Sequence, residues 1–177
     1  MTPAEKLCLA CGLCCDGTLF GHVKLGPADD VKRLKTLGLP VAVTRGRTPV
    51  THFPQRCAAL CTDCTCRVYA DRPRQCRTFE CGVFQAAQAG RITFPAARRT
   101  VKKARRQADR VRQLLLRLGD TEHQRALSER FHRTQRRLES GRVDAAAADT
   151  FAELSQAMHT LDLLTHEKFH TKAAARR

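Results

Sequence analysis

The sequence predicts a mainly α-helical protein, in which a small, irregular, metal-stabilised, cysteine-rich domain precedes an antiparallel three-helix bundle or helical hairpin. All ten cysteines lie within residues 1–90, whereas long apolar runs at helical spacing occur only in the second half. The composition changes between Gly90 and Pro95, so we expect domains at residues 1–92 and 93–177. A chain of 177 residues is long enough for both.

The first half offers only short elements. We expect a strand around residues 19–25, a helix over 27–37 that Gly38 ends, and a second strand at 41–44. Residues 72–79 suit a short helix, because the proline in its first turn lacks an N–H that would be unbonded there anyway. With so few large apolar residues, this half is expected to gain folding free energy from a bound metal.

The second half indicates three amphipathic helices. Over residues 101–118, apolar side chains recur at spacings of three and four until Gly119. Thr121 and Gln124 resemble a capping box that opens a second helix, which continues to Gly141. A third helix follows, and helices with such short connections pack most simply as an antiparallel bundle or hairpin. The expected core positions of the third helix are Ala147, Phe151, Leu154, Met158, Leu161 and Leu164.

The cysteines fall into two clusters. The first has the pattern CxxCxxCC and consists of Cys8, Cys11, Cys14 and Cys15. Cysteines three apart around a turn can direct two thiolates at one metal ion, and Gly12 readily adopts the positive φ of such a turn. The second cluster consists of Cys57, Cys61, Cys64, Cys66, Cys76 and Cys81. Neither cluster alone has the spacing of a complete tetrahedral site, so we expect both to converge on one or two metal sites.

The compartment decides how these thiols are interpreted. No apolar run approaches the ~18–20 residues that cross a bilayer, and the N-terminus lacks the basic start and apolar core of a secretory signal. We therefore expect a cytoplasmic protein whose thiols stay reduced. Ten cysteines in a reducing compartment indicate metal ligands or redox chemistry rather than disulfides. Buried cysteines without ligands are the alternative, but four within eight residues favour a metal.

The cysteine pattern resembles that of a known family. The CxxCxxCC run, the segment Cys57-Ala58-Ala59-Leu60 and the segment CRVYADRPRQCRTFEC at residues 66–81 together resemble the CxxCxxCC (YkgJ-like) cysteine-cluster family. The resemblance covers about residues 5–85 and implies a zinc- or iron-chelating domain, which also occurs in flagellin lysine methylases with an implied iron–sulfur cluster. By position, the family's cysteine set falls on Cys8, Cys11, Cys14, Cys15, Cys57, Cys66, Cys76 and Cys81. Cys61 and Cys64 depart from that set.

Zinc is the preferred metal, because four thiolates form a closed structural zinc site. Iron, as an ion or an iron–sulfur cluster, is the alternative. Tyr69 is expected to pack its ring against the cysteine turn. Arg72 and Arg77 are expected to donate to carbonyls near the metal or to offset thiolate charge, unless they are simply solvated.

The second half carries a basic surface. Residues 96–142 contain 15 basic and 5 acidic side chains, and Arg99, Lys102 and Arg106 are the candidate anion contacts. Such a surface attracts nucleic acid, anionic lipid or an acidic protein, and a solvated face is the alternative. The basic run contains no aromatic residue on which a single-stranded base could stack.

Two further motifs are weak. The CxxxCxxC spacing at residues 57–64 occurs in radical S-adenosylmethionine proteins, but this chain lacks the alternating strands and helices of that barrel. The HExxH motif at residues 166–170 occurs in zinc proteases, but only seven residues follow it and no third ligand is evident. We interpret both as coincidences of spacing.

These features favour a metal-binding protein rather than an enzyme. Two other functions remain open. One is an iron–sulfur protein that acts in redox chemistry or in modification of a protein lysine. The other is a zinc-stabilised protein that binds nucleic acid through its basic helices.

Overall fold

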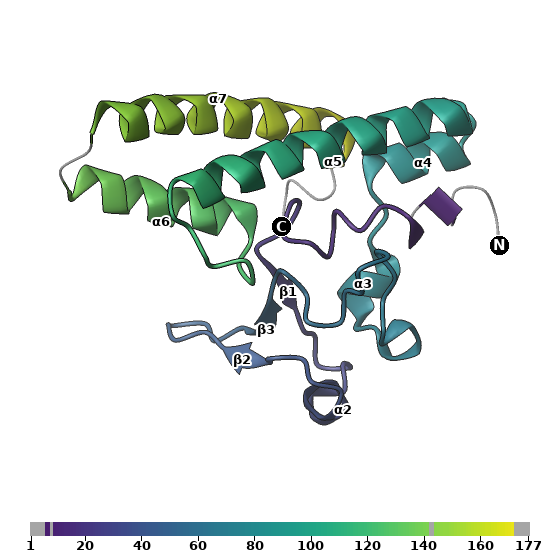
Figure 1. Cartoon of the computed structure of the whole chain (residues 1–177). Coiled ribbons are helices and arrows are strands. Elements are labelled where there is room, and N and C mark those ends of the chain that lie inside the picture. Colours follow the sequence, from purple (N-terminus) through teal and green to yellow (C-terminus); the bar gives the residue numbers. More distant parts are fainter. Residues whose placement is uncertain (1–5, 8, 142–143, 172–177) are drawn as a thin grey trace.

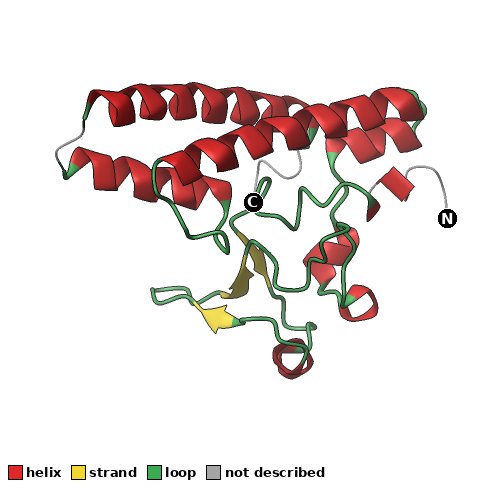
Figure 2. Cartoon of the chain, in the orientation of Figure 1, coloured by secondary structure: helices red, strands yellow, loops and turns green. Residues whose placement is uncertain are grey.

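Helices dominate the computed structural model, as the sequence predicted, and the strands are confined to one small sheet (Figure 2). The structure describes residues 6–7, 9–141 and 144–171. The helices are α2 (Val31–Thr36), the 3₁₀ helix η1 (Tyr69–Asp71), α3 (Arg74–Thr78), α4 (Gly82–Gln88), α5 (Phe94–Arg117), α6 (Leu127–Glu139) and α7 (Ala145–Lys168). Within these residues, none of the helices has both the length and the apolar character needed to span a bilayer.

The sheet has the order β1 (His22–Lys24), β3 (Thr51–Pro54), β2 (Ala42–Val43), and all pairs are antiparallel. The sequence predicted β1 and β2 but missed the central strand β3. Val23 and Phe53 face each other in this sheet and are buried. They form an apolar cluster with Leu34 of α2, Leu39 and Val68. This small core supports the loops that carry the cysteines.

Helix α2 is shorter than the expected helix over 27–37. Asp30 caps its N-terminus by accepting a hydrogen bond from the Arg33 N–H. Asp29 instead accepts hydrogen bonds from the backbone N–H groups of Gly26 and Arg74. Asp29 therefore connects the loop before α2 to the start of α3.

The long helices share one apolar core. Helix α7 runs back along α5, and α6 lies beside the C-terminal part of α5 (Figure 1). The core residues come from all three helices and are Ala108, Val111, Leu114, Leu115, Leu127, Leu154, Ala157, Met158 and Leu161. The amphipathic patterns read from the sequence are confirmed for the faces of α5 and α7 that are buried here.

Helix α6 begins at Leu127 with Ala126 as its N-cap, five residues later than the capping box at Thr121 suggested. The intervening loop is bonded to the first half of the chain instead. The Arg56 N–H donates to the Gln124 carbonyl at 2.9 Å, and the Leu127 N–H donates to the Gly17 carbonyl at 2.9 Å. These tertiary hydrogen bonds compete with local capping, which is why the helix starts late.

Residues from both halves form another apolar cluster. Its buried members are Leu7, Leu13, Val83, Ala97, Val101, Ala104 and Phe169. Gly82 permits the close approach: a Cβ there would lie 2.6 Å from the Lys168 carbonyl oxygen, and the Gly82 N–H donates to the Phe169 carbonyl at 2.9 Å. The cysteine-rich loops therefore rest on α5 and on the end of α7.

Candidate metal centre

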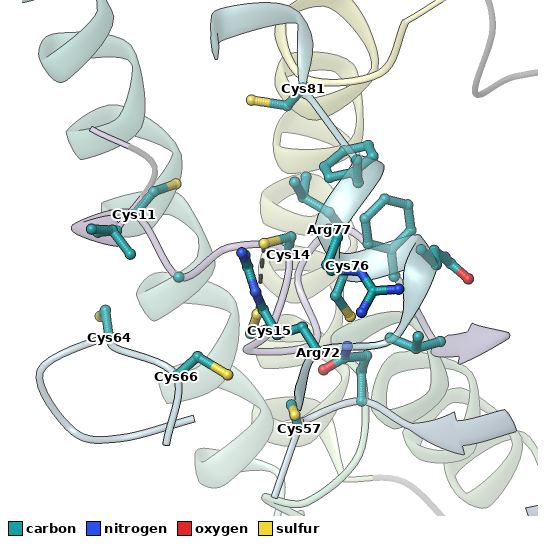
Figure 3. A pocket seen from close by; sticks show the side chains of 18 of the residues that line it. Cys11, Cys14, Cys15, Cys57, Cys64, Cys66, Arg72, Cys76, Arg77 and Cys81 are labelled. Atoms are coloured by element: carbon teal, nitrogen blue, oxygen red, sulfur yellow. Dashed lines mark hydrogen bonds between the residues drawn. The ribbon is translucent and has the colours of Figure 1, made fainter. Parts of the chain in front are cut away.

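Cysteines from three distant segments line one cavity of about 350 Å³ (Figure 3). They belong to the loop before β1, to the loop between β3 and η1, and to the region of α3 and α4. The lining cysteines are Cys11, Cys14, Cys15, Cys57, Cys64, Cys66, Cys76 and Cys81. Cys61 does not line this cavity, and Cys8 lies outside the described residues.

The first cysteine turn is built around Gly12. Its φ is +70°, as expected for a glycine in this position. The N–H groups of Cys15 and Asp16 both donate to the Gly12 carbonyl at 2.9 Å, which closes the turn. The Cys15 carbonyl accepts from the Cys57 N–H at 2.8 Å. A backbone hydrogen bond thus attaches the second cysteine segment directly to the first.

The remaining thiols are placed by short local structures. Cys66 forms an isolated antiparallel bridge with Leu60, so the chain turns back on itself between them. Cys76 lies within α3. Cys81 caps α4, and its sulfur accepts from the Phe84 N–H at 3.4 Å. Each of these thiols is only partly buried, and all carry free sulfhydryl groups.

The thiols influence each other's ionisation. The sulfur atoms of Cys14 and Cys15 lie 3.6 Å apart. The hydrogen bond from Cys15 lowers the pKa of Cys14, and the same bond together with burial raises the pKa of Cys15. Burial also raises the pKa values of Cys57 and Cys81. Without metal, the thiols of Cys15, Cys57 and Cys81 are therefore protonated near neutral pH.

Cys76 shows how strongly the cavity disfavours added negative charge. Burial, followed by repulsion from the thiolates of Cys57 and Cys14, raises the pKa of Cys76 to about 12. A bound cation reverses this penalty, because metal coordination stabilises the thiolate form.

Arg72 brings a positive charge to the cavity. Its guanidinium lies 3.6 Å from the centroid of the Tyr69 ring, and its Nε donates to the Tyr69 carbonyl at 3.1 Å. The Arg72 charge favours the thiolate forms of Cys14 and Cys76. Tyr69 and Arg77 also line the cavity. The Tyr69 ring is thus covered by Arg72, and Tyr69 is half exposed.

Two arginines of α5 hold the first cysteine turn, and the sequence analysis assigned both only to the basic surface. Arg105 Nη1 donates to the carbonyl of Ala10 at 3.0 Å and to that of Cys11 at 3.5 Å. Arg112 pairs with Asp16 at 2.8 Å. Arg105 and Arg112 are seven residues apart, which places them on the same face of α5. That spacing is the one feature of the sequence that could have predicted their common role.

The other basic residues of α5 point elsewhere. Arg99, Lys102 and Arg106 are exposed. Among the described residues, they form no ion pair with an acidic side chain.

The HExxH motif does not form the face of one helix. Helix α7 ends at Lys168, so His170 lies beyond it. The rings of His166 and His170 are 6.2 Å apart between centroids, and Glu167 pairs with Lys168 at 2.5 Å. The motif's second histidine therefore lies outside the helix that carries the first.

The donor set fits zinc or iron, because both metals bind thiolates. In the part of the chain that the structure describes, no three Cys, His, Asp or Glu side chains already surround one point as metal ligands do. Eight of the cysteines nevertheless line one cavity.

Comparison with known proteins identifies the family. A family model with the description "CxxCxxCC: Putative zinc- or iron-chelating domain" matches residues 7–106. The match includes every cavity-lining cysteine and extends into α5 as far as Arg106, just beyond Arg105. Searches of curated proteins and of solved structures gave no match. Because the family model covers more than half of the chain, the protein belongs to the CxxCxxCC family of zinc- or iron-chelating domains.

Proposed function

We propose that this protein binds zinc or iron through the thiolates around the cavity, with zinc as the preferred metal. The supporting observation is that three segments, up to 70 residues apart between Cys11 and Cys81, bring eight cysteines to one cavity. A metal ion would connect these segments and add folding free energy to a region with a small apolar core. The family's full cysteine set also includes Cys8.

The number of thiolates exceeds the need of a single ion. A structural zinc site uses four ligands, and eight cysteines line the cavity. The cavity volume of about 350 Å³ is also many times the ~10–15 Å³ that one water-sized sphere requires. We therefore expect more than one metal ion per chain, or an iron–sulfur cluster if iron is the natural metal.

The role of the centre is inferred to be structural or storage-related rather than enzymatic. Four thiolates around zinc form a closed site with no open position for a substrate. The free thiols of the cavity favour a reducing compartment such as the cytoplasm.

Elemental analysis combined with an absorption spectrum tests this function. The protein should be purified anaerobically without a metal-chelating tag, and we expect at least one equivalent of zinc or iron per folded chain. A colourless zinc protein supports the preferred metal. A brown iron protein with sulfide supports the iron–sulfur alternative, which would then be examined for redox chemistry or lysine modification. Substoichiometric metal in folded protein would overturn the proposal.

Nucleic-acid binding is a second candidate function, based on the exposed Arg99, Lys102 and Arg106, which form no ion pair with the acidic side chains that the structure describes. These residues lie on consecutive turns of α5, where they can contact successive phosphates. The test is salt-dependent binding to duplex DNA and RNA. Reversal of all three charges should weaken binding and flatten its salt dependence. Unchanged affinity would contradict this candidate and leave an acidic protein as the remaining partner class.

A further inference from the structure

Cys64 does not belong to the family's cysteine set, yet it lines the metal cavity with the family cysteines. Its side chain lies directly against the first cysteine turn. A Cβ built on Gly12 would lie 3.1 Å from Cys64 Cβ and 3.2 Å from Cys64 Sγ. The Cys64 sulfur therefore occupies the space above Gly12, between Cys11 and Cys14 along the chain.

The backbone holds Cys64 in this position. Its N–H donates to the Cys61 carbonyl at 3.1 Å, and its φ of +70° is a conformation that residues other than glycine rarely adopt. Asp63 accepts from both the N–H and the hydroxyl of Thr65, at 3.0 and 2.6 Å, which fixes the next residue of the turn. The loop thus presents Cys64 to the cavity at a conformational cost.

Cys64 also has a second thiol beside it on the same loop. Cys66 follows after one residue and lines the same cavity. Figure 3 shows Cys64 and Cys66 together below Cys11, on the opposite side of Arg72 from Cys76. Cys64 lies against the first cysteine turn and Cys66 lines the same cavity, so this loop supplies two thiols, which are soft donors that zinc and iron prefer.

We propose that Cys64 is an additional metal-binding thiolate of this chain, which acts together with Cys66 on the side of the cavity formed by the Gly12 turn. This inference rests on the proposed function, since it assigns a further ligand to the same centre. Its consequence is that metal capacity exceeds what the family's cysteine set provides alone.

Cys61 provides a matched control within the same loop. It is three residues from Cys64 and also departs from the family's set, but it does not line the cavity. The Cys61 backbone N–H donates to the Thr65 carbonyl at 2.9 Å, an interaction that a serine would keep. Cys61→Ser and Cys64→Ser are therefore the same chemical change, the first outside the cavity and the second inside it.

The experiment compares the full-length wild type with C61S and C64S during anaerobic titration with zinc and with cobalt(II). The measurements are metal bound per chain, affinity, and the thiolate-to-cobalt charge-transfer absorption. We expect C64S to bind less metal, or to bind it about tenfold or more weakly, with reduced charge-transfer absorption. We expect C61S to match the wild type.

The outcomes separate this inference from the proposed function. If C64S matches the wild type, or if C61S and C64S lose metal equally, Cys64 is not a ligand and the inference is overturned. If the wild type itself binds no metal, the proposed function fails instead.

A second measurement does not depend on the folding of a variant. The metal-loaded wild type is treated with iodoacetamide, and the alkylated cysteines are located by mass spectrometry. Cys64 should be protected while Cys61 is alkylated, and removal of the metal should expose Cys64. Alkylation of Cys64 at the rate of Cys61 in the loaded protein would overturn the inference.

Discussion

Leu115 of α5 is fully buried among side chains of three helices, whereas the thiols of Cys14, Cys57 and Cys76 are only partly buried around a cavity. The helical half is thus stabilised by apolar packing along regular elements. The cysteine-rich half depends on short strands, backbone hydrogen bonds between loops, and a set of thiols that repel one another when ionised. The comparison teaches that the helical half is held by a continuous apolar core, whereas the first half combines a small apolar core with a cavity lined by thiols.

Removal of the metal should produce the largest difference in stability between the cysteine-rich half and the helical half. A structural zinc ion contributes roughly 10–16 kcal/mol to the folding of small domains. After chelation, we expect hydrogen exchange to increase throughout residues 11–81, while α5 and α7 keep their protection and their helical circular dichroism. Equal loss of protection in both regions would show that the two halves depend on the metal alike.

A rise in pH should lower the stability of the metal-free protein and raise the affinity of the protein for metal. The pKa of Cys76 is raised to about 12, above the ~8.5 of a thiol in an unfolded chain. The metal-free protein should therefore lose stability as pH rises through this window, because the unfolded chain releases its proton first. Metal binding displaces protons, so affinity should rise by about tenfold per pH unit for each thiol that ionises. Titration calorimetry in buffers of different ionisation enthalpy counts those protons, and a pH-independent affinity would contradict the mechanism.

Core truncation should affect the helical half alone. Leu115 is 0% exposed, and Leu115→Ala should reduce the free energy of unfolding by about 2–5 kcal/mol. Leu116 is its neighbour at 56% exposure, so Leu116→Ala is the matched control with a small effect. Denaturant unfolding measures both. Metal stoichiometry should stay at the wild-type value, and a loss of metal from Leu115→Ala would show that the two regions are energetically coupled.

The smallest effect is expected from a substitution at the contact between α5 and the first cysteine turn. Arg105 donates to the carbonyls of Ala10 and Cys11, whereas the neighbouring Arg106 is exposed. Arg105→Gln should weaken metal binding by about tenfold, because groups that orient metal ligands typically contribute ~10–100-fold to affinity. Arg106→Gln should leave metal affinity unchanged. Equal effects of both variants would indicate a general role of helix charge instead of a specific hydrogen bond.

The sequence was sufficient for features that depend on local periodicity or on a local motif. Apolar spacing of three and four identified the buried faces of α5 and α7, because helix geometry alone places those residues on one side. The cysteine spacing identified the family, and the glycine of CxxCxxCC indicated its positive φ. Strand β3 was missed although it is the longest of the three, because it ends in Pro54, which strands disfavour, and Phe53 is the one fully buried residue among its four.

Features that depend on the approach of distant segments were decided by the tertiary structure. The start of α6 is set by hydrogen bonds to Arg56 and Gly17, which no local capping pattern reveals. Arg105 and Arg106 are adjacent and chemically identical, yet Arg105 donates to the carbonyls of Ala10 and Cys11 whereas Arg106 is exposed. Cys61 and Cys64 were equivalent departures from the family pattern, and only Cys64 meets Gly12. The physical reason is that a sequence encodes which face a side chain occupies on its own element, whereas the partner of that face depends on how elements far apart in the chain pack together.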